Sequence, residues 1–307
     1  MSVNLAPILG PFIALLPFFV QGLPAGASEV VGEPPATALP EVEWLSDYGQ
    51  AVAAAKREGR MLLVYFCTPG GNAPCNRFRA TTLSDPQVRA RMANYVCVQV
   101  CLHATVPNEA GGEGSEIRLI HHKAFEEMLG RPGIAIVDYA NPETPHYKRV
   151  VSTFPITDKL WYTPEKMRVI LDLPAGTLTQ RTLIYAVRTH PEGPRSTEGD
   201  PCADLTQEAT EHSRHQAQIR RQGHHFWNVR FQQITQRLPG GLVASEVCAE
   251  SWPGERLVEA AIECVRSWRS SSGHWGTVRA RHERFGYDMK RGGNGVWYAT
   301  GIFGKRP

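Results

Sequence analysis

The chain has 307 residues, of which 42% are hydrophobic and 21% are charged, which is the composition of ordinary globular protein. It is long for one average domain, so we expect two domains, each with its own core. The net charge is only +3, and the basic residues are scattered apart from Arg220-Arg221 and Lys305-Arg306. Such a charge pattern excludes nucleic acid as an expected partner.

The N-terminus has the features of a targeting segment. An apolar run from Leu5 to Val20 precedes Ala25-Gly26-Ala27, the small-x-small form that signal peptidase accepts, so residues 1–27 are predicted to be a signal peptide. Residues 28–40 are rich in Pro, Ala and Glu and are predicted to be a linker. We therefore expect an exported protein that is secreted, periplasmic or bound to the cell surface. Because no Lys or Arg precedes the apolar run, an uncleaved membrane anchor is the alternative.

Seven cysteines in an exported chain permit disulfides, but the odd number leaves at least one thiol free or paired with another molecule. Cys97 and Cys101 lie on one face of a predicted strand, too far apart along it for easy bonding. A bond between Cys248 and Cys264 is one pairing that the sequence permits. The spacings alone do not fix the connectivity.

Residues 41–175 are predicted to alternate helices and strands and to finish with a hairpin and a last helix. The predicted helices are 47–58, 73–83, 86–94, 121–129 and 164–171, and the predicted strands are 61–66, 96–100, 134–139 and 147–153. This order resembles the thioredoxin fold, in particular exported members in which Ala-Lys-Arg-Glu-Gly-Arg, here residues 55–60, precedes the first central strand. The resemblance implies an α/β domain.

The thioredoxin resemblance implies a redox motif that is degenerate in this chain. Asn72 occupies the place of the nucleophilic cysteine, and Cys75 is the only cysteine of the usual pair. Dithiol exchange needs two thiols, so we expect no turnover through this motif. Cys67, at the end of the preceding strand, is an alternative partner, and a thiol-disulfide oxidoreductase using Cys67 and Cys75 is the alternative function. Pro132 occupies the place of the cis-proline, where the resemblance implies a groove for extended peptide.

Residues 176–307 are predicted to form the second domain. Pro174-Ala175-Gly176 separates it from the first, and the predicted helices are 177–189, 206–221 and 257–268, followed by a half-buried strand that contains Trp297 and Phe303. Histidines and glutamates stand near the ends of these elements. Imidazoles and a carboxylate are the side chains that bind Zn²⁺ or transfer protons near neutral pH, so they indicate a site if they meet in space.

Three sequence motifs in this half resemble those of bacterial members of the CAP superfamily of cysteine-rich secretory, antigen 5 and pathogenesis-related proteins. They are HSRHQAQIRRQGHH at 212–225, SEVCA at 245–249 and SWRSSSGHW at 267–275. The resemblance implies an αβα sandwich whose cleft contains His224, Glu246 and His274. His225 is the alternative to His224, and Glu250 is the alternative to Glu246. We expect Glu246 to lie at a boundary between a loop and a helix.

One departure limits what this resemblance implies. Many CAP proteins have a second cleft glutamate just after a tryptophan, but Arg269 and Ser270 follow Trp268 here. Because this acid is absent, as is the first motif cysteine, we expect binding rather than catalysis. The expected ligand is a small molecule, a lipid, an extended peptide or a divalent metal such as zinc, the metal being held by His224 and His274. A CAP-type hydrolase is the remaining alternative.

Overall fold

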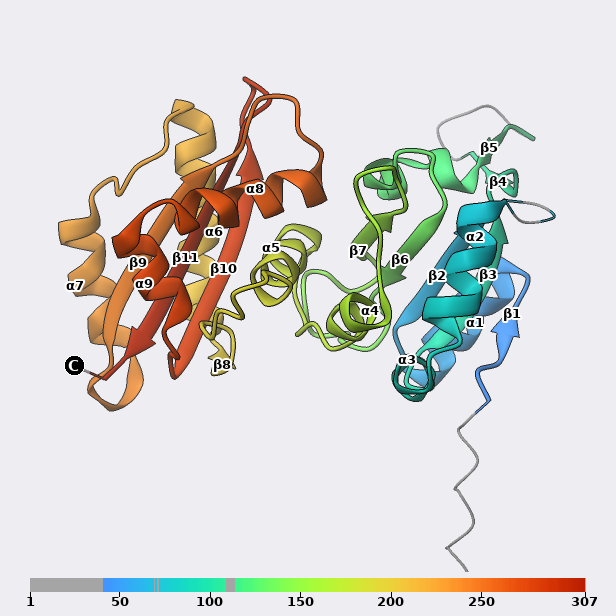
Figure 1. The fold of residues 1–307 in the computed structure, drawn as a ribbon, viewed down its shortest axis with the longest axis horizontal. Helices are drawn as coiled ribbons and strands as arrows, with labels where there is room; N and C mark the ends of the chain where they lie inside the picture. Colours follow the sequence, from blue (N-terminus) through green and yellow to red (C-terminus); the bar gives the residue numbers. More distant parts are fainter. Residues whose placement is uncertain (1–40, 69, 71, 109–113, 307) are drawn as a thin grey trace, which may run out of the picture. The chain divides into compact units, whose positions relative to one another are not determined.

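The computed structural model describes residues 41–68, 70, 72–108 and 114–306 (Figure 1). The predicted signal peptide and linker, residues 1–27 and 28–40, lie outside this described part. Within it, no helix combines the length and the apolar character that crossing a membrane requires. The described residues contain two main sheets, and all their peptide bonds are trans. The bond before Pro132, which occupies the place of the cis-proline in the resemblance, is therefore trans.

The first half of the described chain is built on a five-stranded mixed sheet in the order β1-β3-β2-β6-β7. Its strands are β1 (Trp44–Leu45), β2 (Leu62–Cys67), β3 (Val96–Cys101), β6 (Gly133–Val137) and β7 (Val150–Pro155). β1 and β2 run parallel to β3, whereas β6 is antiparallel to β2 and β7 is antiparallel to β6. A separate hairpin joins β4 (Thr105–Pro107) and β5 (Glu116–Arg118).

Helices cover both faces of this sheet because its strands are apolar on both sides. In β2, Leu62 and Val64 face one core cluster while Leu63 and Tyr65 face the other, as the two-residue period of a strand requires. The first face is covered by α1 (Tyr48–Glu58), η2 (Leu119–His121) and η3 (Lys123–Met128). The opposite face is covered by α2 (Ala73–Phe78), its continuation η1 (Arg79–Leu83), α3 (Pro86–Met92) and α4 (Pro164–Leu171).

Two of the predicted helices in this half are less regular than expected. The predicted helix 121–129 is instead a pair of short 3₁₀ segments, because His122 between them is extended. Phe125 departs from helical dihedrals within the second segment, and Leu129 adopts a left-handed conformation that ends it. The predicted helix 73–83 changes to a π-helix at Arg79. By contrast, the predicted helix 164–171 is found as α4 with the same bounds, capped by the Thr163 side chain.

The second half forms three layers, with a four-stranded sheet between two layers of helices (Figure 1). The sheet order is β8 (Asp200–Pro201), β10 (Arg284–Arg291), β11 (Trp297–Lys305) and β9 (Val243–Glu250). On one face lie α6 (Ala203–Ile219) and α7 (Trp227–Arg237), which η4 (Pro239–Gly241) connects to β9. On the other lie α5 (Leu178–Arg188), α8 (Leu257–Arg269) and α9 (Ser272–Arg279).

The edge strand β9 positions the candidate site. Ala244 packs with the core under α6 and α7, whereas Val247 and Ala249 pack with the core that includes α8. Because side chains alternate along a strand, Glu246 and Cys248 project to the same side as Ala244. The expectation that Glu246 lies at a boundary between a loop and a helix is therefore wrong, since it lies in the middle of a strand.

All seven cysteines are free thiols in the structure. Cys248 projects toward α6 from β9, whereas Cys264 is completely buried in α8 against the other face of the sheet. The permitted bond between Cys248 and Cys264 is therefore not formed, because the sheet separates the two side chains. Cys67 and Cys75 also carry free thiols.

Helix α5 joins the two halves, because it contacts β7 of the first sheet, β10 of the second sheet and the helix α8. Arg181 of α5 is completely buried. Its guanidinium donates hydrogen bonds to the Ser152 hydroxyl at 2.8 Å, the Leu173 carbonyl at 2.9 Å and the Pro174 carbonyl at 2.8 Å. These partners offset the cost of removing a charged group from water.

Candidate functional site

The structure brings His224, Glu246 and His274 together at the edge strand of the second sheet. Nδ1 of His224 lies 2.9 Å from Oε1 of Glu246, and Nε2 of His224 lies 3.0 Å from Nε2 of His274. The three residues come from the loop after α6, from β9 and from the first turn of α9, where Ser271 caps the helix. His224 is exposed and the Glu246 side chain is buried, so the group extends from the interior to the surface.

The buried carboxylate of Glu246 organises the site. Nη1 of Arg230, in α7, lies 2.7 Å from Oε2 of Glu246, while His224 occupies the other oxygen. Burial alone would raise the pKa of Glu246, but the hydrogen bond from His224, the adjacent His212 ring and the positive charge of Arg230 together hold the pKa below its usual value. The carboxylate is therefore ionised near neutral pH and acts as a hydrogen-bond acceptor.

His212 supports this carboxylate from α6. Its Nε2 atom lies 2.9 Å from the Gly223 carbonyl oxygen and 3.8 Å from Oε1 of Glu246. Because a carbonyl oxygen only accepts, this nitrogen carries a hydrogen and donates it to Gly223. Burial lowers the pKa of His212 to about 4, the nearby Glu246 opposing this shift and Arg230 adding to it. His212 is thus neutral at physiological pH and fixes the position of the loop that carries His224.

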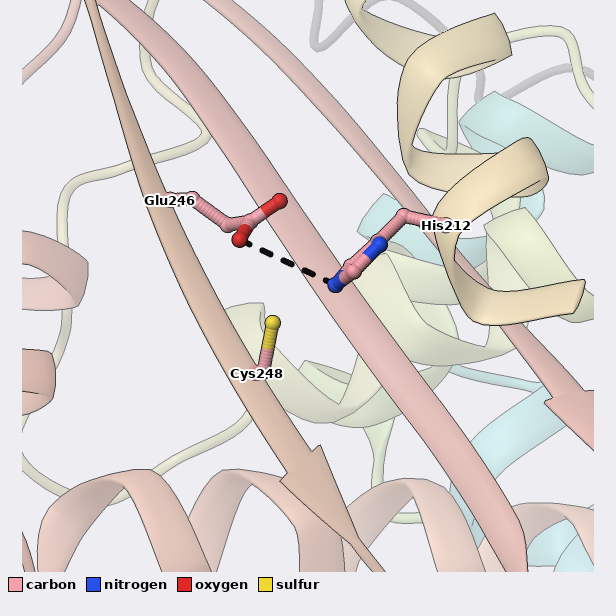
Figure 2. Close-up of side chains that lie close together, drawn as sticks. All are labelled: His212, Glu246 and Cys248. Atoms are coloured by element: carbon pink, nitrogen blue, oxygen red, sulfur yellow. Dashed lines mark ion pairs between the residues drawn. The ribbon is translucent and has the colours of Figure 1, made fainter. Parts of the chain in front are cut away.

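One group of potential metal ligands lies beneath His224. Ligand atoms of His212, Glu246 and Cys248 all lie within 4.8 Å of one another, and Figure 2 shows the Glu246 and Cys248 side chains projecting from β9 on the side of His212. The observed contacts do not suit a cation there. Nε2 of His212 is occupied by Gly223, the guanidinium of Arg230 already neutralises Glu246, and burial raises the pKa of the Cys248 thiol well above its usual value.

The pair formed by His224 and His274 is better suited to a metal. Since the ionised Glu246 accepts a hydrogen from Nδ1 of His224, the atom that this ring presents toward His274 is Nε2, the nitrogen left to bind a metal. Two ligand nitrogens on a tetrahedral zinc, each 2.0–2.1 Å from the metal, lie about 3.3 Å apart. The observed separation of 3.0 Å is therefore a few tenths of an ångström too short, which a small rotation of either ring corrects.

The two alternative residues do not join this group. Nε2 of His225 lies 3.2 Å from the Arg221 carbonyl oxygen, and its ring lies beside His215 and His212 rather than His274. Glu250 is exposed at the end of β9. The structure therefore places His224 and Glu246, rather than His225 and Glu250, opposite His274.

In the first half, Asn72 serves as a helix cap. Its side-chain oxygen accepts a hydrogen bond from the Cys75 amide at 2.9 Å, and its amide donates to the Thr68 hydroxyl at 3.2 Å. Cys75 is completely buried. Burial raises the pKa of the Cys67 thiol, as does the neighbouring Cys75, while Arg79 opposes the shift. A buried thiol with a raised pKa is a poor nucleophile. Pro132 precedes β6 and lines a surface pocket beside Asn72.

Two residues that hold Glu246 in place, His212 and Arg230, are not predicted from the sequence. His212 belongs to the motif HSRHQAQIRRQGHH. It lies on the buried face of its helix with Leu205, Ala209 and Gln216, and this spacing could have indicated a buried histidine. Arg230 was missed because the helix Trp227–Arg237 was not predicted at all. No feature of the sequence identifies the acid that this arginine contacts.

Three comparisons with known proteins give one family match, and its residues lie in the first half. A search of the curated proteins finds no match. One solved structure, an outer surface protein from Borrelia burgdorferi, is similar over 36% of this chain and 78% of that chain, with 17% sequence identity and a TM-score of 0.30. So weak a likeness supports no statement about function. Residues 43–138 match the model of a thioredoxin-like family. Together with the mixed sheet and its covering helices, this match shows that the chain contains a thioredoxin-like domain within an α/β fold.

Proposed function

We propose that this chain is an exported binding protein whose second half is a CAP-like domain that holds a divalent metal ion between His224 and His274. The observation that carries the proposal is the 3.0 Å approach of the two Nε2 atoms at the protein surface. An imidazole whose other nitrogen donates to a carboxylate is the usual form of a histidine that binds zinc, and His224 has this arrangement with Glu246.

Binding is favoured over catalysis by the state of the neighbouring groups. Glu246 is the acid nearest the histidine pair, but its carboxylate is buried and engaged by His224 and Arg230. A general base must reach the proton that it removes, and Glu246 is screened from a surface ligand by His224. In the thioredoxin-like domain, Asn72 replaces the first thiol of the motif and Cys75 is buried. Among the described residues, the expected acid of the second half and the expected thiols of the first half are therefore buried.

The assignment of a CAP-like domain and the export of the protein are supported by different observations. The CAP-like assignment is supported by the three layers of the second half and by the histidines on the loop after α6 and on α9. Export rests on the apolar run and on Ala25-Gly26-Ala27, which lie outside the described residues. A small organic molecule, a lipid or an extended peptide bound at the same histidines, without a metal, is the alternative occupant.

Zinc titration by calorimetry tests the proposal. We expect one Zn²⁺ per chain for the wild-type protein, with binding weakened about tenfold or more in His224→Gln and in His274→Gln. Glu246→Gln should also weaken zinc binding, by about 10–100-fold, since carboxylates that orient a metal-binding histidine have effects of this size. The matched control is His225→Gln, which replaces the adjacent imidazole outside the pair.

Circular dichroism of each variant distinguishes a loss of zinc binding from a loss of the fold. If wild-type protein binds no zinc, or if His225→Gln weakens binding as much as His224→Gln does, the proposed metal site is wrong. Binding that survives in the His224→Gln/His274→Gln double variant leads to the same conclusion.

A further inference from the structure

A pocket of about 640 Å³ lies beside the degenerate motif of the thioredoxin-like domain. It is formed by the start of α2, the loop before β6 and the segment that follows β7. Its lining residues are Asn72, Ala73, Pro74, Arg77, Leu129, Arg131, Pro132, Ile156, Thr157, Asp158, Trp161 and Arg256. A volume of this size is within the range of pockets that hold small organic ligands.

The charge of the lining is positive. Arg77, Arg131 and Arg256 contribute three positive charges and Asp158 contributes one negative charge, which leaves a net charge of +2. Among the residues that the structure describes, no carboxylate lies within ion-pair distance of Arg77 or Arg131. Arg256 is near the carboxylate of Glu127. Burial raises the pKa of Glu127, and the positive charge of Arg256 opposes this shift. Arg77 and Arg131 are thus the two guanidiniums that remain available to an anion.

The remaining wall of the pocket is apolar and well supported. The guanidinium carbon of Arg77 lies 4.8 Å from the centroid of the Trp161 ring, and this indole packs edge-on against Phe78, with centroids 6.0 Å apart. Stacking on the indole fixes the plane of the Arg77 guanidinium and leaves its edge free to bind. Ile156 and Leu129 add aliphatic surface to the same lining. One ligand can therefore contact an arginine and an apolar wall together.

We propose that this pocket binds a small amphipathic organic anion, with a carboxylate or phosphate group on Arg77 and Arg131 and an apolar body against Trp161. Arginine suits this task because its planar guanidinium forms two parallel hydrogen bonds to a carboxylate or phosphate. The apolar body supplies the hydrophobic part of the binding free energy. The site is separate from the histidine pair and does not depend on the function proposed for it.

Calorimetry with probes that share one tail tests this proposal on the full chain. We expect octanoate and octyl phosphate to bind the wild-type protein, and their relative affinity distinguishes a carboxylate ligand from a phosphate ligand. Octanol, which has the tail without the charge, and acetate or inorganic phosphate, which have the charge without the tail, should bind at least about tenfold more weakly.

Variants of exposed residues assign the contacts. Arg77→Gln and Arg131→Gln should each weaken octanoate binding about tenfold, which is the usual effect of losing a charged hydrogen bond. Arg214→Gln is the matched control, because Arg214 is an exposed arginine on α6 outside the pocket. The melting temperature of each variant should equal that of the wild type, since both pocket arginines are exposed.

Four results would overturn the proposal. The first is that neither octyl anion binds, and the second is that octanol binds as tightly as octanoate. The third is that Arg214→Gln weakens octanoate binding as much as Arg77→Gln does. The fourth is that the protein binds a capped, uncharged tetra-alanine peptide but not octanoate, and that the Arg77→Gln/Arg131→Gln double variant still binds the peptide. This result would show a groove for extended peptide in place of an anion site.

Discussion

Acidification should destabilise the protein through His212. The side chain is buried, donates to the Gly223 carbonyl and has a pKa lowered by burial to about 4. In the unfolded chain its pKa returns to about 6.5. The unfolded state therefore binds a proton at pH values where the folded state does not. The stability that this neutral histidine contributes is complete above pH 6.5 and is lost as the pH falls toward 4.

The size of this effect follows from the two pKa values. A shift from about 6.5 to about 4 corresponds to roughly 3 kcal/mol over the whole range. Between pH 7 and pH 5 the loss is about 2 kcal/mol, because the folded-state histidine is still mostly neutral at pH 5. Glu246 does not interfere in this window. Its pKa is also lowered, so its contribution is lost only below the ordinary carboxylate range.

Urea unfolding at pH 7, 6 and 5 measures the effect when wild type and His212→Gln are compared. Glutamine does not ionise, and its side-chain amide can donate to the Gly223 carbonyl as Nε2 of His212 does. The free energy of unfolding of the variant should therefore fall about 2 kcal/mol less than that of the wild type between pH 7 and pH 5. His103→Asn, at an exposed histidine, should behave as the wild type does. An equal loss in wild type and His212→Gln would refute the argument.

Three further predictions concern the fold, the thiols and the link between the halves. Gly286→Ala should destabilise the protein by at least about 2 kcal/mol, because the added Cβ would lie 2.3 Å from the backbone of Leu205; Gly276→Ala, which meets nothing within 4 Å, should not destabilise it. The protein should not reduce insulin in the presence of dithiothreitol above the uncatalysed rate, and turnover that Cys75→Ser abolishes would contradict the loss of dithiol chemistry. Limited proteolysis should cut within residues 28–40 sooner than within 174–176, and early release of a fragment starting near Gly176 would show that the halves are independent.

Much of the regular structure follows from local patterns in the sequence. Helix α4 was predicted with its observed bounds because Thr163 is a good cap, Pro164 suits the first turn, and Met167, Ile170 and Leu171 have the period of a buried helix face. The segment around Phe125 has a similar apolar pattern but forms 3₁₀ turns. Tertiary packing overrode helix propensity there, since Phe125 is held between Tyr48 of α1 and Phe66 of β2.

The candidate site was only partly predictable because its key contacts join distant parts of the chain. The resemblance identified His224, Glu246 and His274, which the structure places together. It gave no sign that Glu246 is a buried strand residue. The small and apolar residues that follow it allow either structure, and the sheet pairing that decides the matter involves β11, more than 45 positions later. Arg230 could not be assigned to Glu246, because an ion pair leaves no periodic pattern in the sequence.

The buried guanidinium of Arg181 has a consequence for how the protein is made. Its partners, Ser152 and the carbonyls of Leu173 and Pro174, all leave the ribosome before it does. The thioredoxin-like half can therefore gather these acceptors while the remainder is still being translated, and α5 then docks as the first element of the next half. A gene fragment that begins at Gly176 would instead produce a chain whose arginine has lost these acceptors. The buried arginine of the second half thus takes its acceptors from the half that is translated first.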